Sequence, residues 1–183
     1  MANIITKTTE LVKKFWLEYI NEDSVAIDAT VGNGNDTLFL SERCRKVYGF
    51  DIQQEAINVT KQKLVKENTE LFCASHDRMA ELIKEKADIM VFNLGYLPNG
   101  NHDVTTSAET TVEAVSQALN IINKGGLISI VMYWGHEEGK REREAVLSLA
   151  RALDEKTFHV MYISFPNQAN CPPEAILITR KTD

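Results

Sequence analysis

A carboxylate followed by a glycine-rich turn is the segment of this sequence with the clearest chemical potential. The apolar run at residues 24–28 ends in Asp28, and Gly32 and Gly34 follow it closely. Glycine lets the backbone turn sharply and approach a bound molecule, and Asn35 or Asp36 is placed to cap a following helix. The pattern predicts a ligand-binding turn between a strand and a helix; alternatively, it is a tight turn without a ligand.

The residue types around this turn favour one class of ligand. Asp51 ends the next apolar segment, where its carboxylate could accept both hydroxyls of a ribose. A pyrophosphate site requires G-x-G-x-x-G, but position 37 is Thr, and the sequence contains no G-x-x-x-x-G-K-[ST] of a P-loop. Asp28 would repel a pyrophosphate but suits the ammonium of a methionine moiety, directly or through water. These features predict S-adenosylmethionine rather than NAD as the cofactor.

Polar residues also follow the third and fourth apolar segments. Ser75 and His76 come after residues 70–73, where they could contact an adenine or, equally well, cap a helix. Residues 93–98 read Asn-Leu-Gly-Tyr-Leu-Pro. They match, in position and at both ends but not in the middle, the [DNS]-P-P-[YF] motif of amino-group methyltransferases. In that motif an amide oxygen and a backbone carbonyl hold an NH₂ group while the aromatic ring stacks on a base.

An aliphatic amine must be neutral to accept a methyl group. With a pKa of about 10.4, as for lysine, only about one molecule in 10³ would react at pH 7. Asn93 and the carbonyl of Leu94 supply hydrogen-bond acceptors, Tyr96 supplies a stacking face, and Asp103 or His102 could take a proton. The last two are also explained as polar residues at a loop tip. The sequence predicts catalytic roles for Asn93, Tyr96 and Asp103.

These residues require an alternation of strands and helices to bring them together. Hydrophobic periodicity predicts helices at residues 6–20, 36–43, 53–66, 79–84, 106–122 and 137–153, and strands at 24–28, 47–50, 70–73, 87–93, 127–133, 157–164 and 175–180, with a turn at 123–126. Such alternation indicates a parallel sheet covered on both faces, and the two final strands indicate an antiparallel C-terminal strand. We predict one domain over residues 1–183, a doubly wound, Rossmann-like α/β fold with the seven-stranded sheet of class I methyltransferases.

Composition and charge indicate the cellular compartment of this domain and limit how it can bind a metal or nucleic acid. The 183 residues contain no apolar run near the roughly 20 needed to cross a bilayer. Three widely spaced cysteines fit neither a disulfide framework nor a zinc site, so we expect a cytoplasmic protein that binds no metal. The net charge of −6 argues against holding nucleic acid by bulk electrostatics. The densest basic patch, at residues 140–143, is interleaved with glutamates and favours a helix face of ion pairs.

Two later segments are expected at the same sheet edge as the predicted turn. Tyr133, Trp134 and His136 follow the fifth strand, where aromatic rings could stack on an unstacked RNA base. Alternatively, Trp134 only covers the sheet edge. Asn167 and Asn170 belong to an amide-rich loop that we place on the substrate side.

Taken together, the motifs resemble the small bacterial family of rRNA methylases of the YtqB (MnmM) type. The matching stretches cover most of the chain in order, at residues 27–40, 50–53, 75–76, 93–98, 133–144 and 167–173, and Asn99 departs from an expected glycine. The resemblance implies methylation of 5-aminomethyluridine at the tRNA wobble position to give 5-methylaminomethyluridine. It also implies a homodimer and cofactor contacts from Asn33, Asn35, Asp51, Gln53, Ser75 and His76.

The sequence thus predicts an S-adenosylmethionine-dependent methyltransferase that acts on the anticodon stem-loop of tRNA. The predicted cofactor residues are Asp28, Thr30, Gly32, Asn33, Gly34, Asn35, Asp36, Thr37, Asp51, Ile52, Gln53, Ser75 and His76. The predicted substrate residues are Leu94, Gly95, Pro98, Tyr133, Trp134, His136, Asn167 and Asn170. The alternatives are a methyltransferase for rRNA or another amine, a non-catalytic nucleotide-binding regulatory module and, third, an NAD oxidoreductase. A regulatory module has no need for the acceptors and aromatic ring of residues 93–98.

Overall fold

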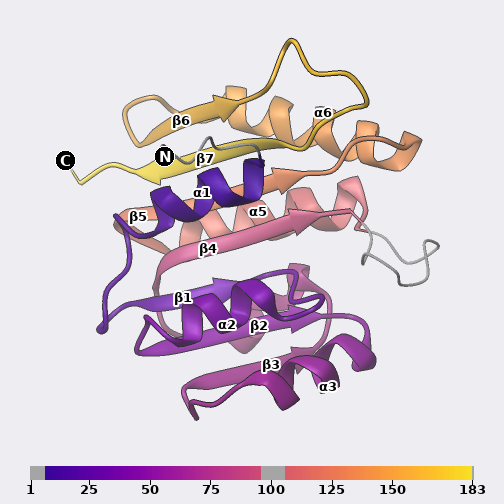
Figure 1. Ribbon diagram of the computed structural model, residues 1–183. Helices are drawn as coiled ribbons and strands as arrows, with labels where there is room; N and C mark the ends of the chain where they lie inside the picture. The colour runs from indigo at the N-terminus through magenta and orange to yellow at the C-terminus, as the bar shows by residue number, and fades with distance from the viewer. Residues whose placement is uncertain (1–6, 96–105, 183) are drawn as a thin grey trace, which may run out of the picture.

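The computed structural model describes residues 7–95 and 106–182, whose helices lie on both sides of one sheet (Figure 1). The strands are β1 (Val25–Asp28), β2 (Lys46–Asp51), β3 (Thr69–Cys73), β4 (Ala87–Leu94), β5 (Ile122–Met132), β6 (Phe158–Ile163) and β7 (Glu174–Arg180). The helices are α1 (Thr8–Trp16), α2 (Asn35–Ser41), α3 (Gln54–Lys63), the 3₁₀ turn η1 (His76–Arg78), α4 (Met79–Leu82), α5 (Ala108–Ile121) and α6 (Glu137–Ala152). Within the described ranges, no helix combines the length and apolar character needed to cross a bilayer.

The strands form one seven-stranded sheet in the order β3-β2-β1-β4-β5-β7-β6. The pairs from β3 to β5 are parallel, whereas β7 is antiparallel to both β5 and β6. This confirms the predicted class I methyltransferase sheet with an antiparallel C-terminal strand. Because β7 is inserted between β5 and β6, the edge of the sheet is formed by β6, the first strand of the final hairpin.

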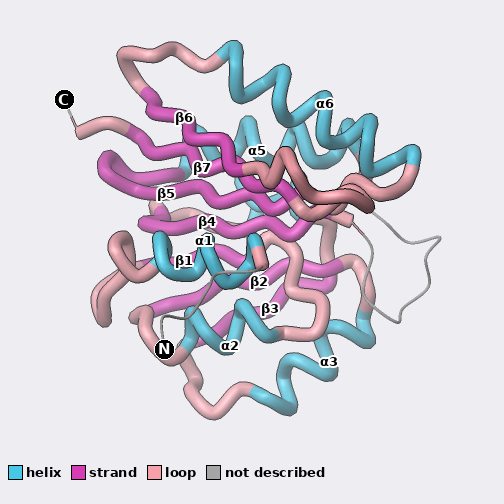
Figure 2. The backbone as a smooth tube through the Cα atoms, turned by 45° about the horizontal axis from the view of Figure 1, so that its top comes forward, coloured by secondary structure: helices cyan, strands magenta, loops and turns pink. Residues whose placement is uncertain are grey.

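Helices cover both faces of the sheet, as Figures 1 and 2 show. On one face, Val12 and Trp16 of α1 and Leu40 of α2 pack with Ile89 and Val91 of β4. A second apolar cluster fills the other face, where α5 and α6 contribute Ala114, Val115, Ala118, Val146, Leu147 and Ala150. Burial on both faces explains why β4 is apolar almost throughout, as expected for a central parallel strand.

The structure differs from the sequence prediction mainly at the ends of elements. The first helix is shorter, and α2 begins at Asn35 with Gly34 rather than Asn35 or Asp36 at its N-cap. Residues 123–126, predicted as a turn, belong to β5 because its pairing with β4 continues beyond them. That pairing is irregular, since Ala87 lies opposite Ile122 but Ile89 lies opposite Leu127. Long-range strand pairing therefore overrides the local turn signal.

The carboxyl ends of the parallel strands lie together at one end of the sheet, and three predicted site residues lie there. Asp28 ends β1, Asp51 ends β2, and Asn93 is the penultimate residue of β4. The chain runs outward from β1 through β2 to β3 and then crosses back to β4 on the other side of β1, so the order of the strands reverses at β1. Open α/β sheets bind their ligands in the crevice at such a point.

Candidate active site

Asp28 lies beneath the turn that follows β1 and is fully buried. Its carboxylate accepts hydrogen bonds from the Thr30 backbone N–H at 3.1 Å and the Thr37 hydroxyl at 2.6 Å. Burial raises the pKa of Asp28 to about 7, and the negative charge of nearby Asp36 adds to that effect. Asp28 therefore holds the turn together, and its contact with a methionine ammonium, directly or through water, stays a prediction.

The two glycines of the turn both have a positive φ, and each has a different structural role. Gly34 has φ +75°, and a Cβ there would lie 2.4 Å from the Thr60 hydroxyl of α3, so only glycine fits. Gly32 has φ 51°, and its N–H donates to the Asp51 carboxylate at 2.8 Å. The turn is thus bound to the end of β2. The neighbouring side chains of Asn33 and Asn35 are exposed.

Asp51 is placed to accept the hydroxyls of a ribose. One carboxylate oxygen accepts the Gly32 N–H and the other accepts the Gln53 N–H, each at 2.8 Å. A carboxylate oxygen can accept two hydrogen bonds, so each retains an acceptor position. Ile52 beside it is 54% exposed and offers an apolar surface for a purine ring.

His76 provides a buried acceptor near this surface. Its Nδ1 lies 3.3 Å from the Ala29 carbonyl oxygen, and burial lowers the pKa of the ring, so the imidazole is neutral at pH 7. Nδ1 then carries the proton, while Nε2 is a buried acceptor that has no hydrogen-bond partner among the described residues. Ser75 occupies the N-cap of η1, but its side chain makes no capping bond. An adenosine, with ribose hydroxyls and a donor NH₂, fits the groups on Asp51, Ile52 and His76.

Asn93 is held from two sides at the end of β4. Its backbone N–H donates to the Thr30 hydroxyl at 2.7 Å, and its amide nitrogen donates to Asp36 at 2.8 Å. The second carboxylate oxygen of Asp36 pairs with the Lys13 ammonium of α1 at 2.5 Å. With its nitrogen engaged, the amide presents its carbonyl oxygen as an acceptor. No sequence motif marks Lys13, because only the packing of α1 brings it here.

The residues that follow β4 are partly used by the fold itself. The Leu94 carbonyl, predicted to hold an amine, accepts the Tyr133 N–H at 3.1 Å and keeps one further acceptor position. Gly95 has φ +144°, and a Cβ there would lie 3.2 Å from Cβ of Tyr133. Glycine thus allows Tyr133, which is 38% exposed, to lie against this turn. The predicted residues Tyr96, Pro98, His102 and Asp103 lie outside the described ranges.

Trp134 is fixed by the protein itself. Its indole N–H donates to the Pro172 carbonyl at 2.9 Å, and the Arg143 guanidinium lies 4.9 Å from the ring centre. These contacts favour the covering role over base stacking. His136 occupies the N-cap of α6, and the side chains of Asn167 and Asn170 are exposed.

The basic residues at positions 140–143 are paired with glutamates, and two of these pairs follow from helical spacing, as predicted. Lys140 pairs with Glu137 at 2.7 Å, Arg141 with Glu138 at 3.1 Å, and Arg143 with Glu174 at 2.5 Å. These ion pairs neutralise the patch. Helix α6 therefore does not supply a free cationic surface here.

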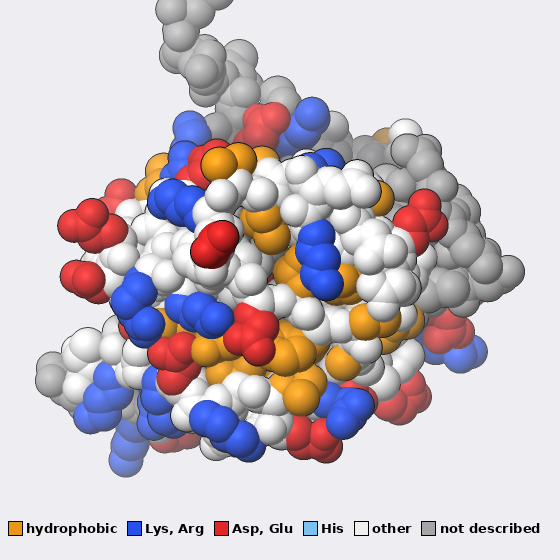
Figure 3. Space-filling view, turned by 90° about the horizontal axis from the view of Figure 1, so that it is seen from below, with side chains coloured by type: hydrophobic (Ala, Val, Ile, Leu, Met, Phe, Trp, Pro, Cys, Tyr) orange, Lys and Arg blue, Asp and Glu red, His pale blue; other side chains and the backbone are white. Residues whose placement is uncertain are grey.

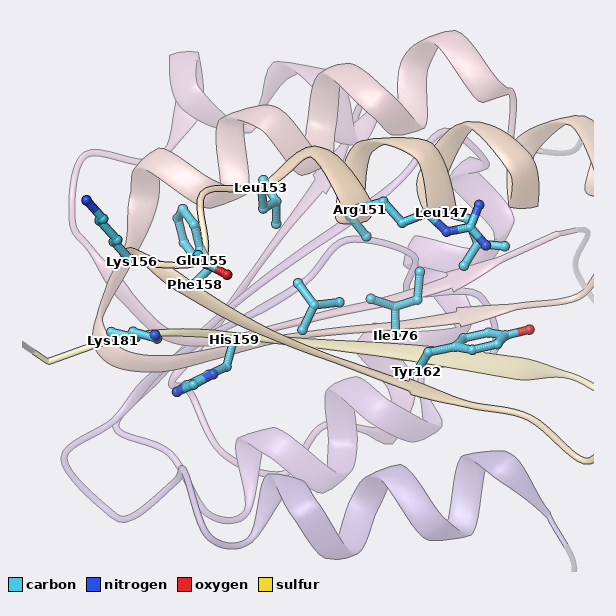
Figure 4. A pocket seen from close by; sticks show the side chains of 12 residues that line it. Leu147, Arg151, Leu153, Glu155, Lys156, Phe158, His159, Tyr162, Ile176 and Lys181 are labelled. Atoms are coloured by element: carbon cyan, nitrogen blue, oxygen red, sulfur yellow. The ribbon is translucent and has the colours of Figure 1, made fainter.

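A groove of about 640 Å³ lies away from this crevice, between α6 and the edge strand β6 (Figure 4). Lys156 and Lys181 lie at one end and Tyr162 at the other, with Phe158 and Ile176 between them. It includes no predicted site residue. The candidate site is the crevice at the ends of β1, β2 and β4, where the polar groups converge.

Comparison with known proteins shows the family to which this chain belongs. Residues 47–179 match the family model described as "Putative rRNA methylase". The chain belongs to the rRNA methylase family. It is 38% identical over 164 residues to the chloroplastic tRNA (mnm(5)s(2)U34)-methyltransferase of Arabidopsis thaliana, an alignment that covers 80% of this chain and 60% of that protein.

Two solved structures have the same fold along nearly the whole chain. An rRNA methylase of Clostridium thermocellum superposes with a TM-score of 0.94 at 37% identity. SMU.1697c of Streptococcus mutans, a methyltransferase crystallised with S-adenosylhomocysteine (SAH), superposes with a TM-score of 0.90 at 38% identity. Both alignments cover 97% of this chain and 99% of the other. The predicted enzyme class, an S-adenosylmethionine-dependent methyltransferase, and its cofactor are confirmed.

The buried Asp28 leads to a prediction about stability and pH. In the unfolded chain its pKa is near 3.8, whereas in the fold it is about 7. The folded chain therefore holds a proton that the unfolded chain has lost, so stability falls as pH rises from about 4 to about 7. Asp28→Asn keeps an acceptor for Thr30 and a partner for Thr37 without the charge. We expect it to gain roughly 2–4 kcal/mol over the wild type at pH 8, and less at pH 5. Urea unfolding at both values measures this, and a difference independent of pH would contradict it.

Proposed function

We propose that this chain is an RNA methyltransferase that transfers a methyl group from S-adenosylmethionine to the aminomethyl nitrogen of 5-aminomethyluridine at the tRNA wobble position. The observation that carries the proposal is the Asn93 amide, held with its oxygen available at the same end of the sheet as Asp51, the candidate ribose acceptor. The Arabidopsis relative, named for wobble position U34 of tRNA, supports this substrate. The chain spans 60% of that relative's length.

The proposed chemistry requires alignment of two groups more than acid or base catalysis. S-adenosylmethionine supplies a methyl group on a sulfonium, and attack by the neutral amine breaks the carbon–sulfur bond to leave a thioether and a secondary ammonium that loses a proton to water. Asn93 accepts a hydrogen bond from the amine and directs its lone pair toward the methyl carbon. Asp51 and His76 hold the adenosine end. Alignment of this kind is worth roughly 7–11 kcal/mol.

RNA recognition in this proposal rests on a splayed base. Positive and negative side chains are intermingled on the face shown in Figure 3, so that face presents no broad field of one sign. Together with the net charge of −6, this favours few phosphate contacts and a shallow salt dependence. Tyr133, which is exposed and lies against Gly95 at the end of β4, is the candidate stacking partner.

Replacing Tyr133 with alanine tests this recognition. Stacking of a base on an aromatic ring is worth about 1–3 kcal/mol, so we expect KM for tRNA to rise roughly 5- to 150-fold. Tyr133→Phe retains the ring and should remain within about threefold of the wild type. Steady-state kinetics at several salt concentrations measure KM for tRNA and its salt dependence. Full activity of Tyr133→Ala, combined with a steep salt slope, would assign binding to a cationic surface instead.

Incubation with labelled cofactor and tRNA bearing 5-aminomethyluridine, followed by nucleoside mass spectrometry, tests the function itself. The expected product is 5-methylaminomethyluridine. Methyl on a ring carbon, on a ribose oxygen or on rRNA alone would refute the proposed substrate. The family description keeps rRNA as the second candidate. A homodimer and a cytoplasmic location stay predictions, and the Arabidopsis relative is chloroplastic.

A further inference from the structure

Lys13 is a charged residue that the fold fixes beside the crevice although no motif marks it. Its helical neighbours Val12 and Trp16 are each 1% exposed and pack in one apolar cluster with β4 and β5. The Lys13 ammonium lies 5.3 Å from the ring centre of Phe39 in α2 and 2.5 Å from Asp36. Helix α1 therefore places a cation at the start of α2.

Asp36 connects this cation to the catalytic amide. One of its carboxylate oxygens accepts from Lys13, and the other accepts from the amide nitrogen of Asn93 at 2.8 Å. If the amide turned over, its oxygen would face the Asp36 carboxylate without a proton between them. The Lys13–Asp36 pair therefore selects the orientation in which the Asn93 oxygen is free for a substrate.

The charge of Asp36 also matters for an amine substrate. Its negative charge adds to burial in raising the pKa of both Asp28 and Tyr133, which shows that its field reaches across the crevice. An unbalanced carboxylate would in the same way stabilise an ammonium ion near Asn93. Only the neutral amine can accept a methyl group. A cation paired to Asp36 offsets this effect.

We propose that Lys13 is a positioning residue for methyl transfer: through Asp36 it fixes the Asn93 amide, and its charge offsets the carboxylate that would otherwise hold the target amine as ammonium. The inference rests on the proposed amine substrate. The charged or titratable described groups that interact with Asp36 are Lys13 from α1, Asp28 from β1 and Tyr133 after β5, and Asp51 from β2 acts on Asp28 in turn.

The test is the pH dependence of the single-turnover methylation rate, with enzyme and cofactor saturating, because that rate reports the bound amine. An opposite charge close by moves a pKa by roughly 1–3 units. For Lys13→Met we expect the acid limb of the profile to move up by about one pH unit and the rate at pH 7 to fall about tenfold. Lys13→Arg should restore the profile, and Asp36→Asn should move the limb in the opposite direction.

Lys14→Met is the matched control, since it removes an exposed lysine from the same helix and should leave the profile unchanged. SAH affinity of Lys13→Met, measured by calorimetry, should stay within about threefold. A loss above tenfold would make Lys13 a cofactor ligand and overturn the proposal. A rate lowered equally at all pH values would leave orientation of the Asn93 amide as the role of Lys13 and overturn the charge-balancing part.

Two further comparisons distinguish titration of Asp28 from the effect of Lys13, and failure of the proposed function from failure of the inference. The series is repeated in the Asp28→Asn background, and a limb that shifts only when Asp28 is present would assign the titration to Asp28 and overturn the inference. Wild-type enzyme that makes no methylated 5-aminomethyluridine refutes the proposed function. Wild-type activity with Lys13→Met behaving like Lys14→Met refutes the inference alone.

Discussion

Asn93→Ala is expected to lower kcat by roughly 10²- to 10³-fold, the cost of removing one preorganised hydrogen-bonding group from an active site. The amide is fixed by the Thr30 hydroxyl and the Asp36 carboxylate before any substrate arrives, so its loss removes alignment that is already built into the fold. The adenosine end of the crevice does not use Asn93. SAH affinity should therefore change by less than about threefold, and single-turnover rates with calorimetry measure the two effects separately.

Asn120→Ala provides a matched control for the loss of an amide. Asn120 lies on α5 and donates to the Ser116 carbonyl at 3.0 Å, away from the sheet edge that carries the candidate site. Its replacement should leave the rate unchanged. If Asn93→Ala retained more than a tenth of the wild-type rate, the amide would not be the group that aligns the amine.

The parts of the site that follow from the sequence are those encoded by local pattern. Apolar segments that end in Asp28, Asp51 and Asn93 alternate with helices, and parallel strands collect their carboxyl ends at one edge. The fold class and the place of the crevice can therefore be predicted without coordinates. The paired basic residues of α6 are likewise a matter of helical spacing.

The parts that do not follow depend on contacts between distant segments. Lys13 reaches Asp36 only because α1 packs on the sheet, and the insertion of β7 between β5 and β6 is decided by long-range strand pairing. The packing of Thr60 of α3 against Gly34, which leaves no room for a Cβ there, has no signal in the sequence. The complete burial of Asp28 likewise comes from the layers around β1.

Asp51 gives the second large prediction, because it is the residue that ties the glycine turn to the expected ribose. A hydrogen bond to a charged group contributes about 1.5–3 kcal/mol, so Asp51→Ala should weaken SAH binding roughly 10- to 150-fold. The same carboxylate also accepts the Gly32 and Gln53 N–H groups, so the variant loses contacts within the fold as well. The experiment must separate ligand contact from general destabilisation.

Asp88 allows that separation. Its carboxylate also stabilises the fold, because it accepts the Val25 N–H at 2.9 Å and the Asn123 amide at 2.7 Å. Asp88 lies at the start of β4, however, at the end of the sheet opposite the candidate site. Asp88→Ala should therefore lower the urea midpoint much as Asp51→Ala does while leaving SAH affinity unchanged. Asp51→Asn, which keeps one acceptor oxygen, should fall between wild type and Asp51→Ala. Equal SAH affinities for Asp51→Ala and Asp88→Ala, measured by calorimetry on folded protein, would show that Asp51 stabilises the turn without binding the ribose.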